Sequence, residues 1–441
     1  FQRVKLKTIW TRTAEGKCKA RTVALGNRID AEEHSRYCNV VQTPHARAVM
    51  TVGLANGMDI EICDIKSAYV SCRGVQKIYV DSLPPEFGAL AGRGAYVKSN
   101  LYGLPTAGAV FAMDLQTKLL GAGFKQSTHD RSVYYRQSDT PEHGKHFCYI
   151  CAYVDDLLIV SHDMTNLRNE LKDLYTMKHF TSATCGLRYV GSDLIHDSKN
   201  KTVHIHAETY ITEMLRHVER GADGEGRMNG LGKSFDLPSF PDREGNEGRT
   251  PSLHDDHAEE LLGAEAEFLQ EQDRETFASY IGCLNWTVTM CRLDIAQAVT
   301  ALSQFLVAPR VGHARRVMRI MSYLKKYSDR GILLDGRDHI EPEGTVAMNE
   351  TARDHLKLEY GDHAEPRDPK DPAARGVPLE LTGYSDADHA SNKADRRSTT
   401  GSLILLGRAI LFWRSKRQIG CEGSSYASEL RAAAWTAREL R

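Results

Sequence analysis

Three aspartates in this sequence have the side-chain type and the surroundings that metal-assisted phosphoryl chemistry requires. Asp155 and Asp156 are adjacent, and apolar runs at residues 147–154 and 157–160 flank them. Two short apolar runs joined by two residues predict a β-hairpin with the acidic pair at its turn. Adjacent carboxylates repel each other, and a divalent cation would neutralise that repulsion. A polar turn would also explain a bare Asp-Asp pair, but a solvated turn does not need two fully buried strands.

A third carboxylate stands close to the end of another predicted strand. Asp64 lies near the end of the strand predicted at residues 58–65. If that strand neighbours the hairpin, Asp64 completes an all-oxygen site of the kind Mg²⁺ prefers. Two such ions about 4 Å apart stabilise the attacking and leaving oxygens of phosphoryl transfer. The sequence therefore predicts a two-metal nucleotidyl-transfer site.

The elements that must position these residues can be read from the pattern around them. Residues 3–26 alternate polar and apolar and predict strands rich in Lys and Arg. Thr43 as N-cap and Pro44 at the first helical position predict a helix that stops at Asn56-Gly57. Residues 106–122 predict a helix with leucines on one face, and another helix follows the capping candidates Asp163 and Thr165. In the helix at 106–122, the leucines expected to share a face are Leu115, Leu119 and Leu120. In the helix after Asp163, they are Leu167, Leu171 and Leu174.

The second half of the chain alternates ordered and polar segments. Residues 219–270 are rich in Gly, Asp, Glu, Ser and Pro and read as a linker or insertion. Residues 277–334 predict two or three helices, and a second polar stretch covers about 336–378. The final block has strand patterns as far as Trp413 and a helix from about Ser424.

Composition excludes several classes of protein. The 441 residues are 41% hydrophobic and 26% charged, which is typical of a globular chain with more than one domain. No apolar run approaches the roughly 20 residues of a membrane-spanning helix. The net charge of −1 is unusual for a nucleic-acid enzyme, but basic residues cluster at 3–28, 315–326 and 396–416. Ten scattered cysteines suggest a reducing compartment, and Cys148 and Cys151 are predicted to pack in the core.

Several motifs in one order resemble the Pol polyproteins of copia-type long-terminal-repeat retrotransposons. The resemblance begins with the reverse transcriptase motifs around Asp64 and Asp155 and covers most of the ordered chain. The segments that carry it are residues 64–70, 99–104, 123–130, 152–159, 294–299, 313–325, 383–388, 396–401 and 424–429. The N-terminus lacks an initiator Met, so the chain is expected to be a piece of a longer protein.

The resemblance implies an α/β protein with the right-hand arrangement of a polymerase. Fingers and palm would occupy residues 1–218, a helical thumb or connection 271–335, and a partial ribonuclease H-like domain 381–441. Residues 219–270 and 336–380 would be linkers. The palm is expected to be an antiparallel sheet with helices on one face, holding Asp64 beside the 155–156 turn.

The same resemblance implies roles for individual residues in RNA-directed DNA synthesis. Asp64 and Asp155 would bind two Mg²⁺ ions, with Mn²⁺ as the alternative metal, and Asp156 would support them. Tyr69 would block a ribose 2′-hydroxyl, although a core aromatic is the competing interpretation. The remaining candidates for deoxynucleotide binding are Tyr102, Gly103, Lys19 and Arg21, the last two being equally explained as a solvated strand face.

The implied partners are an RNA template, a DNA or RNA primer, the RNA–DNA hybrid and deoxynucleoside triphosphates, with no membrane. Integrase and protease segments of a Pol polyprotein are absent from this chain. An intracellular, cytoplasmic location in a virus-like particle is expected, with the nucleus as the alternative. Asp386 and Glu429 would be the first two carboxylates of the ribonuclease H site, whose further aspartates would lie beyond Arg441. Loss of ribonuclease H activity is therefore expected.

Departures from the family pattern keep other functions open. Residues 105–111 lack the basic residues and the proline that the family usually has there, His389 replaces a tryptophan, and residues 291–294 differ from the usual Thr-Arg-Pro-Asp. These changes weaken the prediction of template and primer binding more than the prediction of the metal site. A decayed relic that keeps the fold and binds nucleic acid is the main alternative. A nucleotide cyclase, which also pairs acidic residues on a palm-like fold, is a further one.

Overall fold

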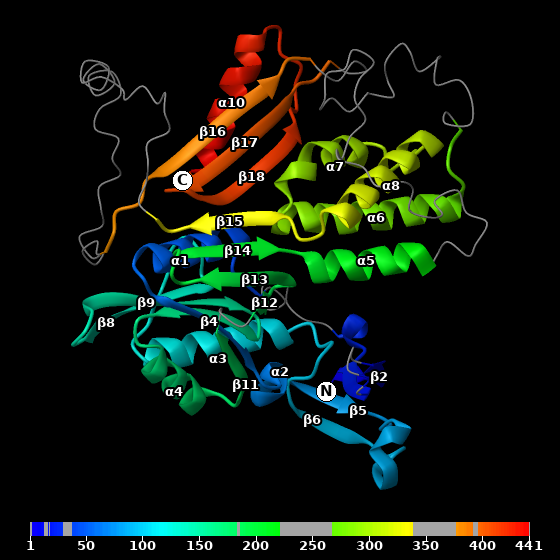
Figure 1. Cartoon of the computed structure of the whole chain (residues 1–441). Helices are drawn as coiled ribbons and strands as arrows, with labels where there is room; N and C mark the ends of the chain where they lie inside the picture. Colours follow the sequence, from blue (N-terminus) through cyan, green and yellow to red (C-terminus); the bar gives the residue numbers. More distant parts are fainter. Residues whose placement is uncertain are drawn as a thin grey trace.

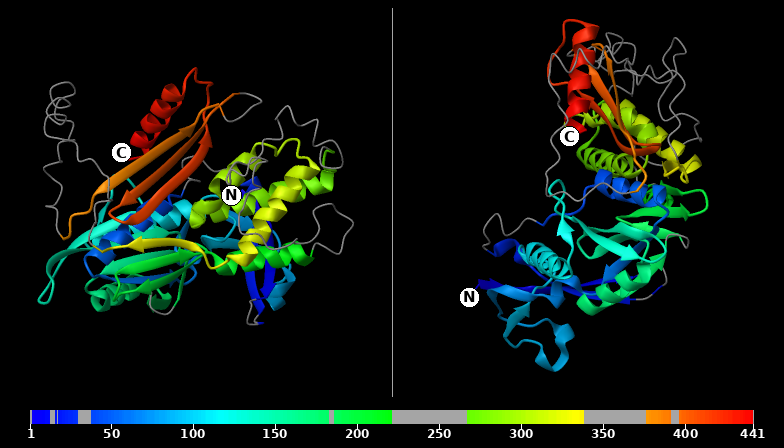
Figure 2. Two further views of the ribbon diagram at one scale, coloured as in Figure 1. Left: turned by 45° about the horizontal axis from the view of Figure 1, so that its top comes forward. Right: turned by 90° about the vertical axis from the view of Figure 1, so that its left-hand side faces the viewer.

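The structure is a computed structural model with a mixed α/β fold. It describes residues 2–12, 16, 18–29, 38–182, 186–220, 267–337, 376–390 and 396–440. Most of the predicted linkers, 219–270 and 336–380, lie outside the described residues. The three-stranded C-terminal sheet and the N-terminal strands lie at opposite ends of the molecule (Figures 1 and 2). No helix in the described ranges has the length and apolar character needed to cross a membrane.

A six-stranded antiparallel sheet holds the predicted catalytic hairpin. Its strand order is β11-β4-β10-β9-β8-β7. The hairpin is formed by β9 (Gly144–Tyr153) and β10 (Asp156–Ser161), and the predicted strand that carries Asp64 is β4 (Asp59–Ile65). The other strands are β7 (Lys125–Gln126), β8 (Val133–Thr140) and β11 (Met177–Ser182). The hairpin and its neighbouring strand were therefore predicted correctly.

Helices cover both faces of this sheet, so the expectation of helices on one face is wrong. On one side α1 (Thr43–Ala55) packs Met50 and Leu54 with Leu158 and Val160 of β10. On the other side α3 (Ala107–Gly121) and α4 (Met164–Leu174) pack with the alternate β10 residues (Figure 1). Successive side chains of a strand point to opposite faces, so an unbroken apolar run requires a cover on each.

Local details of the helices refine the sequence predictions. Gln42, not Thr43, is the N-cap of α1, and Pro44 lies in the first turn. Asp163 caps α4 as predicted, because its side chain accepts a hydrogen bond from the Asn166 backbone N–H. In α3, Leu115 and Leu119 are buried but Leu120 is 45% exposed. Adjacent helical residues differ by about 100° around the axis, so Leu119 and Leu120 do not share a face.

Basic strands at the N-terminus were also predicted. β2 (Leu6–Arg12) and β3 (Cys18–Ala24) form a two-stranded hairpin. β1 (Gln2–Val4) joins β5 (Arg73–Val80) and β6 (Ala95–Ser99) in a small sheet. Short helices lie between these strands, namely η1 (Gly26–Arg28), α2 (Ala68–Ser71) and η3 (Pro85–Leu90).

A four-stranded sheet links segments far apart in the sequence. It consists of β12 (Leu187–Tyr189), β13 (Ser192–Asp197), β14 (Thr202–His206) and β15 (Gly331–Asp335). Residues 331–334, predicted to be helical, are therefore a strand. Ile332 and Leu334 are buried while Leu333 is exposed, which is the two-residue period of a strand.

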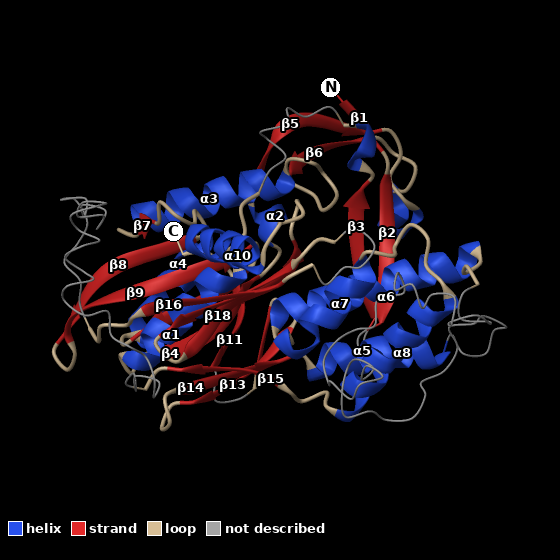
Figure 3. Ribbon diagram, turned by 90° about the horizontal axis from the view of Figure 1, so that it is seen from above, coloured by secondary structure: helices blue, strands red, loops and turns tan. Residues whose placement is uncertain are grey.

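Helices beside this sheet confirm the rest of the 277–334 prediction. They are α5 (Glu208–Arg220), α6 (Glu271–Met290), η7 (Leu293–Ile295), α7 (Ala296–Ser303) and α8 (Val311–Lys326). Figure 3 shows α5 to α8 grouped at one side of the sheets. Their buried faces share one hydrophobic core with α1 and with the sheet β12–β15.

The C-terminal block has the predicted strands and helix. β16 (Leu381–Asp388), β17 (Thr399–Leu406) and β18 (Ala409–Arg417) form an antiparallel sheet, and α10 (Ser425–Glu439) packs on it with Ser424 as N-cap. Arg47 of α1 joins this sheet to the rest of the protein. Its guanidinium donates to the carbonyls of Leu411 in β18 and of Thr289 and Met290 in α6, at 2.7–2.9 Å.

Cys148 and Cys151 lie on β9 and are 2% and 0% exposed. They belong to the two different cores on opposite faces of the sheet. Their predicted role in core packing is therefore confirmed, because side chains on opposite faces cannot share a ligand.

Candidate active site

The strand register brings the three predicted aspartates together. Asp64 of β4 is the direct antiparallel partner of Asp156 in β10. The Ile65 backbone N–H donates to the Asp155 carbonyl at 2.9 Å. Residues directly opposite in such a pair have Cβ atoms about 5 Å apart. Asp155 directly precedes Asp156 in the chain, so the three aspartates lie at one end of the β4–β10 pair.

The turn of the hairpin lies one residue earlier than predicted. Tyr153 pairs with Asp156, so the two turn residues are Val154 and Asp155. Val154 has a φ of 57°, a left-handed conformation that is costly for a β-branched side chain. A positive φ at the first turn residue matches the twist of a two-residue hairpin. Backbone strain of this kind is concentrated at functional sites, where the surrounding structure maintains it.

Burial and mutual repulsion destabilise the ionised forms of Asp155 and Asp156. Burial, followed by the charges of Asp155 and Asp64, raises the pKa of Asp156 to about 6. Burial and the Asp64 charge also raise the pKa of Asp155. An acidic cluster in this state is stabilised by any cation that enters it.

One cation is supplied by Lys178 of β11, which the sequence analysis missed. Its Nζ lies 2.5 and 2.6 Å from the two carboxylate oxygens of Asp64. The Lys178 charge also lowers the pKa of Asp155 and Asp156, although burial outweighs it. No local pattern at residues 177–182 indicates that this segment pairs with β4.

The donor set fits a hard divalent metal in its chemistry, although its side chains do not form a ready ligand cage. Among the described residues, no three His, Cys, Asp or Glu side chains are arranged to hold an ion. Carboxylate oxygens are nevertheless the ligands that Mg²⁺ prefers. The Lys178 ammonium already binds Asp64 where a cation is required. Lys178 would have to release that carboxylate, and the aspartate side chains would have to rotate, for metal to bind.

Two aromatic rings and an arginine border the carboxylates. The Tyr69 ring of α2 lies 5.1 Å from the Tyr102 ring and 6.2 Å from that of Phe111. The Arg21 guanidinium of β3 lies over the Tyr102 ring at 5.8 Å, and its charge lowers the pKa of Asp155. Burial raises the pKa of Tyr69, and the Asp155 charge contributes. Tyr69, Tyr102 and Arg21 are therefore placed beside the predicted metal site.

Lys19 and Gly103 are placed differently from that group. Lys19 is exposed on β3, two residues from Arg21 and so on the same strand face. Gly103 has a φ of +87°, and a Cβ there would lie 2.1 Å from the Ala24 carbonyl oxygen. The Ala24 N–H donates to the Tyr102 carbonyl at 2.7 Å. The backbone at Gly103 is therefore approached closely by β3 of this chain, which docks against the Tyr102–Gly103 backbone.

Comparison with known proteins decides the family. Residues 3–223 match the model of a family described as "Reverse transcriptase (RNA-dependent DNA polymerase)". The chain belongs to this family. The predicted resemblance to copia-type Pol polyproteins is confirmed as well.

Similar curated proteins are the retrovirus-related Pol polyproteins from two plant transposons. The one from transposon RE1 of Arabidopsis thaliana is 27% identical over 433 residues, which cover 96% of this chain and 24% of that protein. The one from transposon TNT 1-94 of Nicotiana tabacum is 23% identical over 457 residues, covering 99% of this chain and 29% of that protein. The chain thus spans about a quarter of the length of these relatives.

Outside the matched reverse transcriptase region, the structure does not bring Asp386 and Glu429 onto one face. Both side chains are exposed. Thr436 of α10 donates to Ser402, whose direct partner in β16 is Ser385. Ser385 therefore faces α10, and the next residue, Asp386, points to the other face of the sheet. Glu429 lies on α10 itself, so the proposed ribonuclease H pair is separated by the sheet.

Proposed function

We propose that this chain is the RNA-directed DNA polymerase of a copia-type retrotransposon and adds deoxynucleotides to a primer 3′-hydroxyl. The pairing of Asp64 with Asp156 at a strained hairpin turn is the observation that carries the proposal. The membership of residues 3–223 in the reverse transcriptase family supports it.

Asp64 and Asp155 would hold two divalent metal ions, with Asp156 supporting them from the base of the turn. When bound, such ions neutralise charge on the attacking and leaving oxygens of phosphoryl transfer. The raised pKa values of Asp155 and Asp156 suit this role, because a carboxylate that burial destabilises gains most from a nearby cation. Lys178 would move from Asp64 to a neighbouring anion once metal binds.

Three residues are proposed to bind the incoming nucleotide. The Tyr69 ring would sit against the sugar and exclude a 2′-hydroxyl, since it is half-buried and fixed by Tyr102 and Phe111. Arg21 would pair with the triphosphate, because its charge already acts on Asp155. Tyr102 would supply the surface between them.

RNA template, primer and deoxynucleoside triphosphates are the proposed partners, and the activity would belong to part of a longer Pol polyprotein. The C-terminal block is proposed to be a ribonuclease H-like domain in which Asp386 and Glu429 do not form an active pair. An intracellular, cytoplasmic site of action is part of the same proposal.

Primer extension on an RNA template with Mg²⁺ tests the polymerase. Extension by the unaltered chain is expected, and Asp155→Asn should reduce it at least about a hundredfold because a metal ligand worth several kcal/mol is lost. Asp173→Asn, which alters an exposed aspartate of α4, is the matched control and should extend normally. Extension that is equally strong in Asp155→Asn would contradict the assignment of the site.

A relic that binds nucleic acid without polymerising is the second candidate. Residues 105–111 favour it, because their family-atypical side chains form the start of α3 directly beside Tyr69. A Cβ added at Gly108 would lie 4.0 Å from the Tyr69 hydroxyl oxygen. Binding of a fluorescent RNA–DNA primer-template, measured by anisotropy without nucleotide, separates the two candidates. Binding without any extension would identify the relic.

A further inference from the structure

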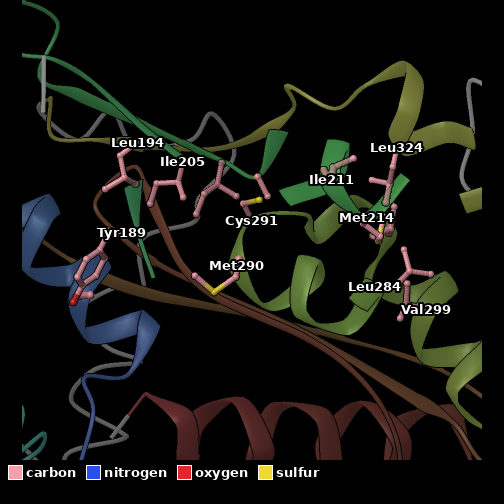
Figure 4. Close-up of a cluster of buried hydrophobic side chains, with 14 of the residues drawn as sticks. Tyr189, Leu194, Ile205, Ile211, Met214, Leu284, Met290, Cys291, Val299 and Leu324 are labelled. Carbon is pink, nitrogen blue, oxygen red and sulfur yellow. The ribbon is translucent and has the colours of Figure 1, made fainter. Parts of the chain in front are cut away.

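A small cavity lies behind the hairpin, where α1, the β12–β14 strands and the end of α6 meet. Its volume is about 30 Å³, and it opens to solvent. In Figure 4, Leu194 and Ile205 lie at the top of this region and Met290 lies lower. Tyr189 lies at the left, with its hydroxyl next to α1. The remaining walls are mostly apolar side chains of α1, Val41 and the hairpin residue Tyr153.

Three buried polar atoms without a hydrogen-bond partner belong to residues that line this one cavity. They are Arg47 Nε, the Tyr189 hydroxyl and the Ser192 Oγ. Their residues are only 2%, 5% and 1% exposed, so bulk water does not satisfy them. A buried polar atom left unpaired costs about 1–3 kcal/mol. Three such atoms around one cavity indicate a ligand that accepts hydrogen bonds.

The charge in the cavity is also uncompensated. Arg47 donates to three backbone carbonyls and lies 4.4 Å from the centre of the Trp413 ring. No carboxylate of the described residues is paired with it. Burial lowers the pKa of Arg47 to about 9, and the one titratable group acting on it is the Cys291 thiol. A buried cation normally has an anionic partner, since leaving it unpaired is strongly unfavourable.

We propose that this cavity binds a small monocarboxylate with a short apolar tail. One carboxylate oxygen would accept from Arg47 Nε, and the hydroxyls of Tyr189 and Ser192 would donate to the remaining lone pairs. The tail would lie along Ile205 and Met290. A cavity needs roughly 10–15 Å³ to hold one water, so the space here suits the carboxylate group of such a ligand, with the tail directed toward the opening, and excludes a nucleotide.

This site is separate from the metal site but adjacent to it. Tyr153 lines the cavity and is the direct partner of Asp156 in the hairpin. The Asp156 charge also contributes to the raised pKa of Tyr189. Ligand binding would therefore occur directly behind the catalytic hairpin. The inference rests on burial and unpaired atoms alone, so it does not depend on polymerase activity.

Calorimetric titration of the whole chain with sodium butyrate, without nucleic acid or nucleotide, tests the proposal. Butyramide, which has the same size and no charge, is the comparison ligand. Butyrate should bind at least about tenfold more tightly than butyramide, because a hydrogen bond to a charged group is worth that factor or more. Tyr189→Phe and Ser192→Ala should each weaken butyrate binding by about tenfold for the same reason.

Both variants remove a hydroxyl that has no partner in the free protein, so neither should lower the thermal stability. Tyr134→Phe changes an equally buried tyrosine in the other core and should leave butyrate binding unchanged. Absence of butyrate binding, equal binding of butyramide, or full binding by Tyr189→Phe and Ser192→Ala would overturn the proposal.

Discussion

Replacing Asp156 with asparagine should stabilise the metal-free protein at neutral and higher pH, although it alters the proposed catalytic site. The pKa of Asp156 is about 6, against an ordinary value of 3.8. Each unit corresponds to about 1.4 kcal/mol, so the ionised carboxylate destabilises the folded state by about 3 kcal/mol at most. The side chain is only half-buried, and solvent screening reduces this to about 1.5 kcal/mol.

The pH dependence follows from the direction of that shift. Because folding raises the pKa, the carboxylate keeps its proton in the folded state until higher pH, and the penalty is absent below the ordinary pKa. It grows between that value and about 6 and is complete above it. The stability gain of Asp156→Asn should therefore be near zero at about pH 4 and complete at about pH 8.

Urea unfolding in the presence of a metal chelator, at several pH values, measures this gain. Asp130→Asn is a control for which the change in the free energy of unfolding should have the opposite sign. Burial opposes ionisation of Asp130, but hydrogen bonds from His45, Gln42 and Ser132 outweigh it and hold its pKa below the ordinary value. That variant should lose stability at about pH 8. A gain of Asp156→Asn that is absent at high pH, or equal at all pH values, would refute the reasoning.

Three further variants test other parts of the site. Lys178→Met should lower the stability of the metal-free protein by about 1 kcal/mol, because a partly exposed ion pair with Asp64 is lost, and should increase the rise in melting temperature caused by MgCl₂. Tyr69→Ala should raise the use of ribonucleotides relative to deoxynucleotides about tenfold or more in single-nucleotide extension, whereas Tyr69→Phe, which keeps the ring, should not. Gly103→Ala should cost about 3 kcal/mol in urea unfolding through backbone strain and a clash with β3, whereas Gly144→Ala, also at positive φ but in open space, should cost about 1 kcal/mol. Unchanged metal response, unchanged sugar selectivity, or equal costs at the two glycines would contradict the respective arguments.

Local patterns in the sequence were sufficient for much of the fold. The apolar runs on either side of Asp155 and Asp156 predicted the hairpin, and the cap and end signals predicted α1 and α4 to within a residue or two. These features depend on side-chain period and on turn chemistry, which are encoded within a few residues.

Errors arose where a residue's neighbours come from distant parts of the chain. Residues 331–334 form β15 because β14, over a hundred residues earlier, provides its hydrogen-bonding edge. Gly103 is required because β3 docks against it, which no local pattern indicates. The packing of α1 on the second face of the sheet was not predicted for the same reason, since sequence period shows that a face is apolar but not what covers it.

By itself, the sequence determined the three carboxylates, their hairpin and the family to which they belong. Side-chain type and order along the chain are sufficient for that. Only the tertiary structure decided that Asp64 faces Asp156 in register, that Lys178 already binds Asp64, and that Asp386 points away from the helix carrying Glu429. Each of these depends on strand pairing, because a shift of one residue in register moves every side chain of a strand to the opposite face.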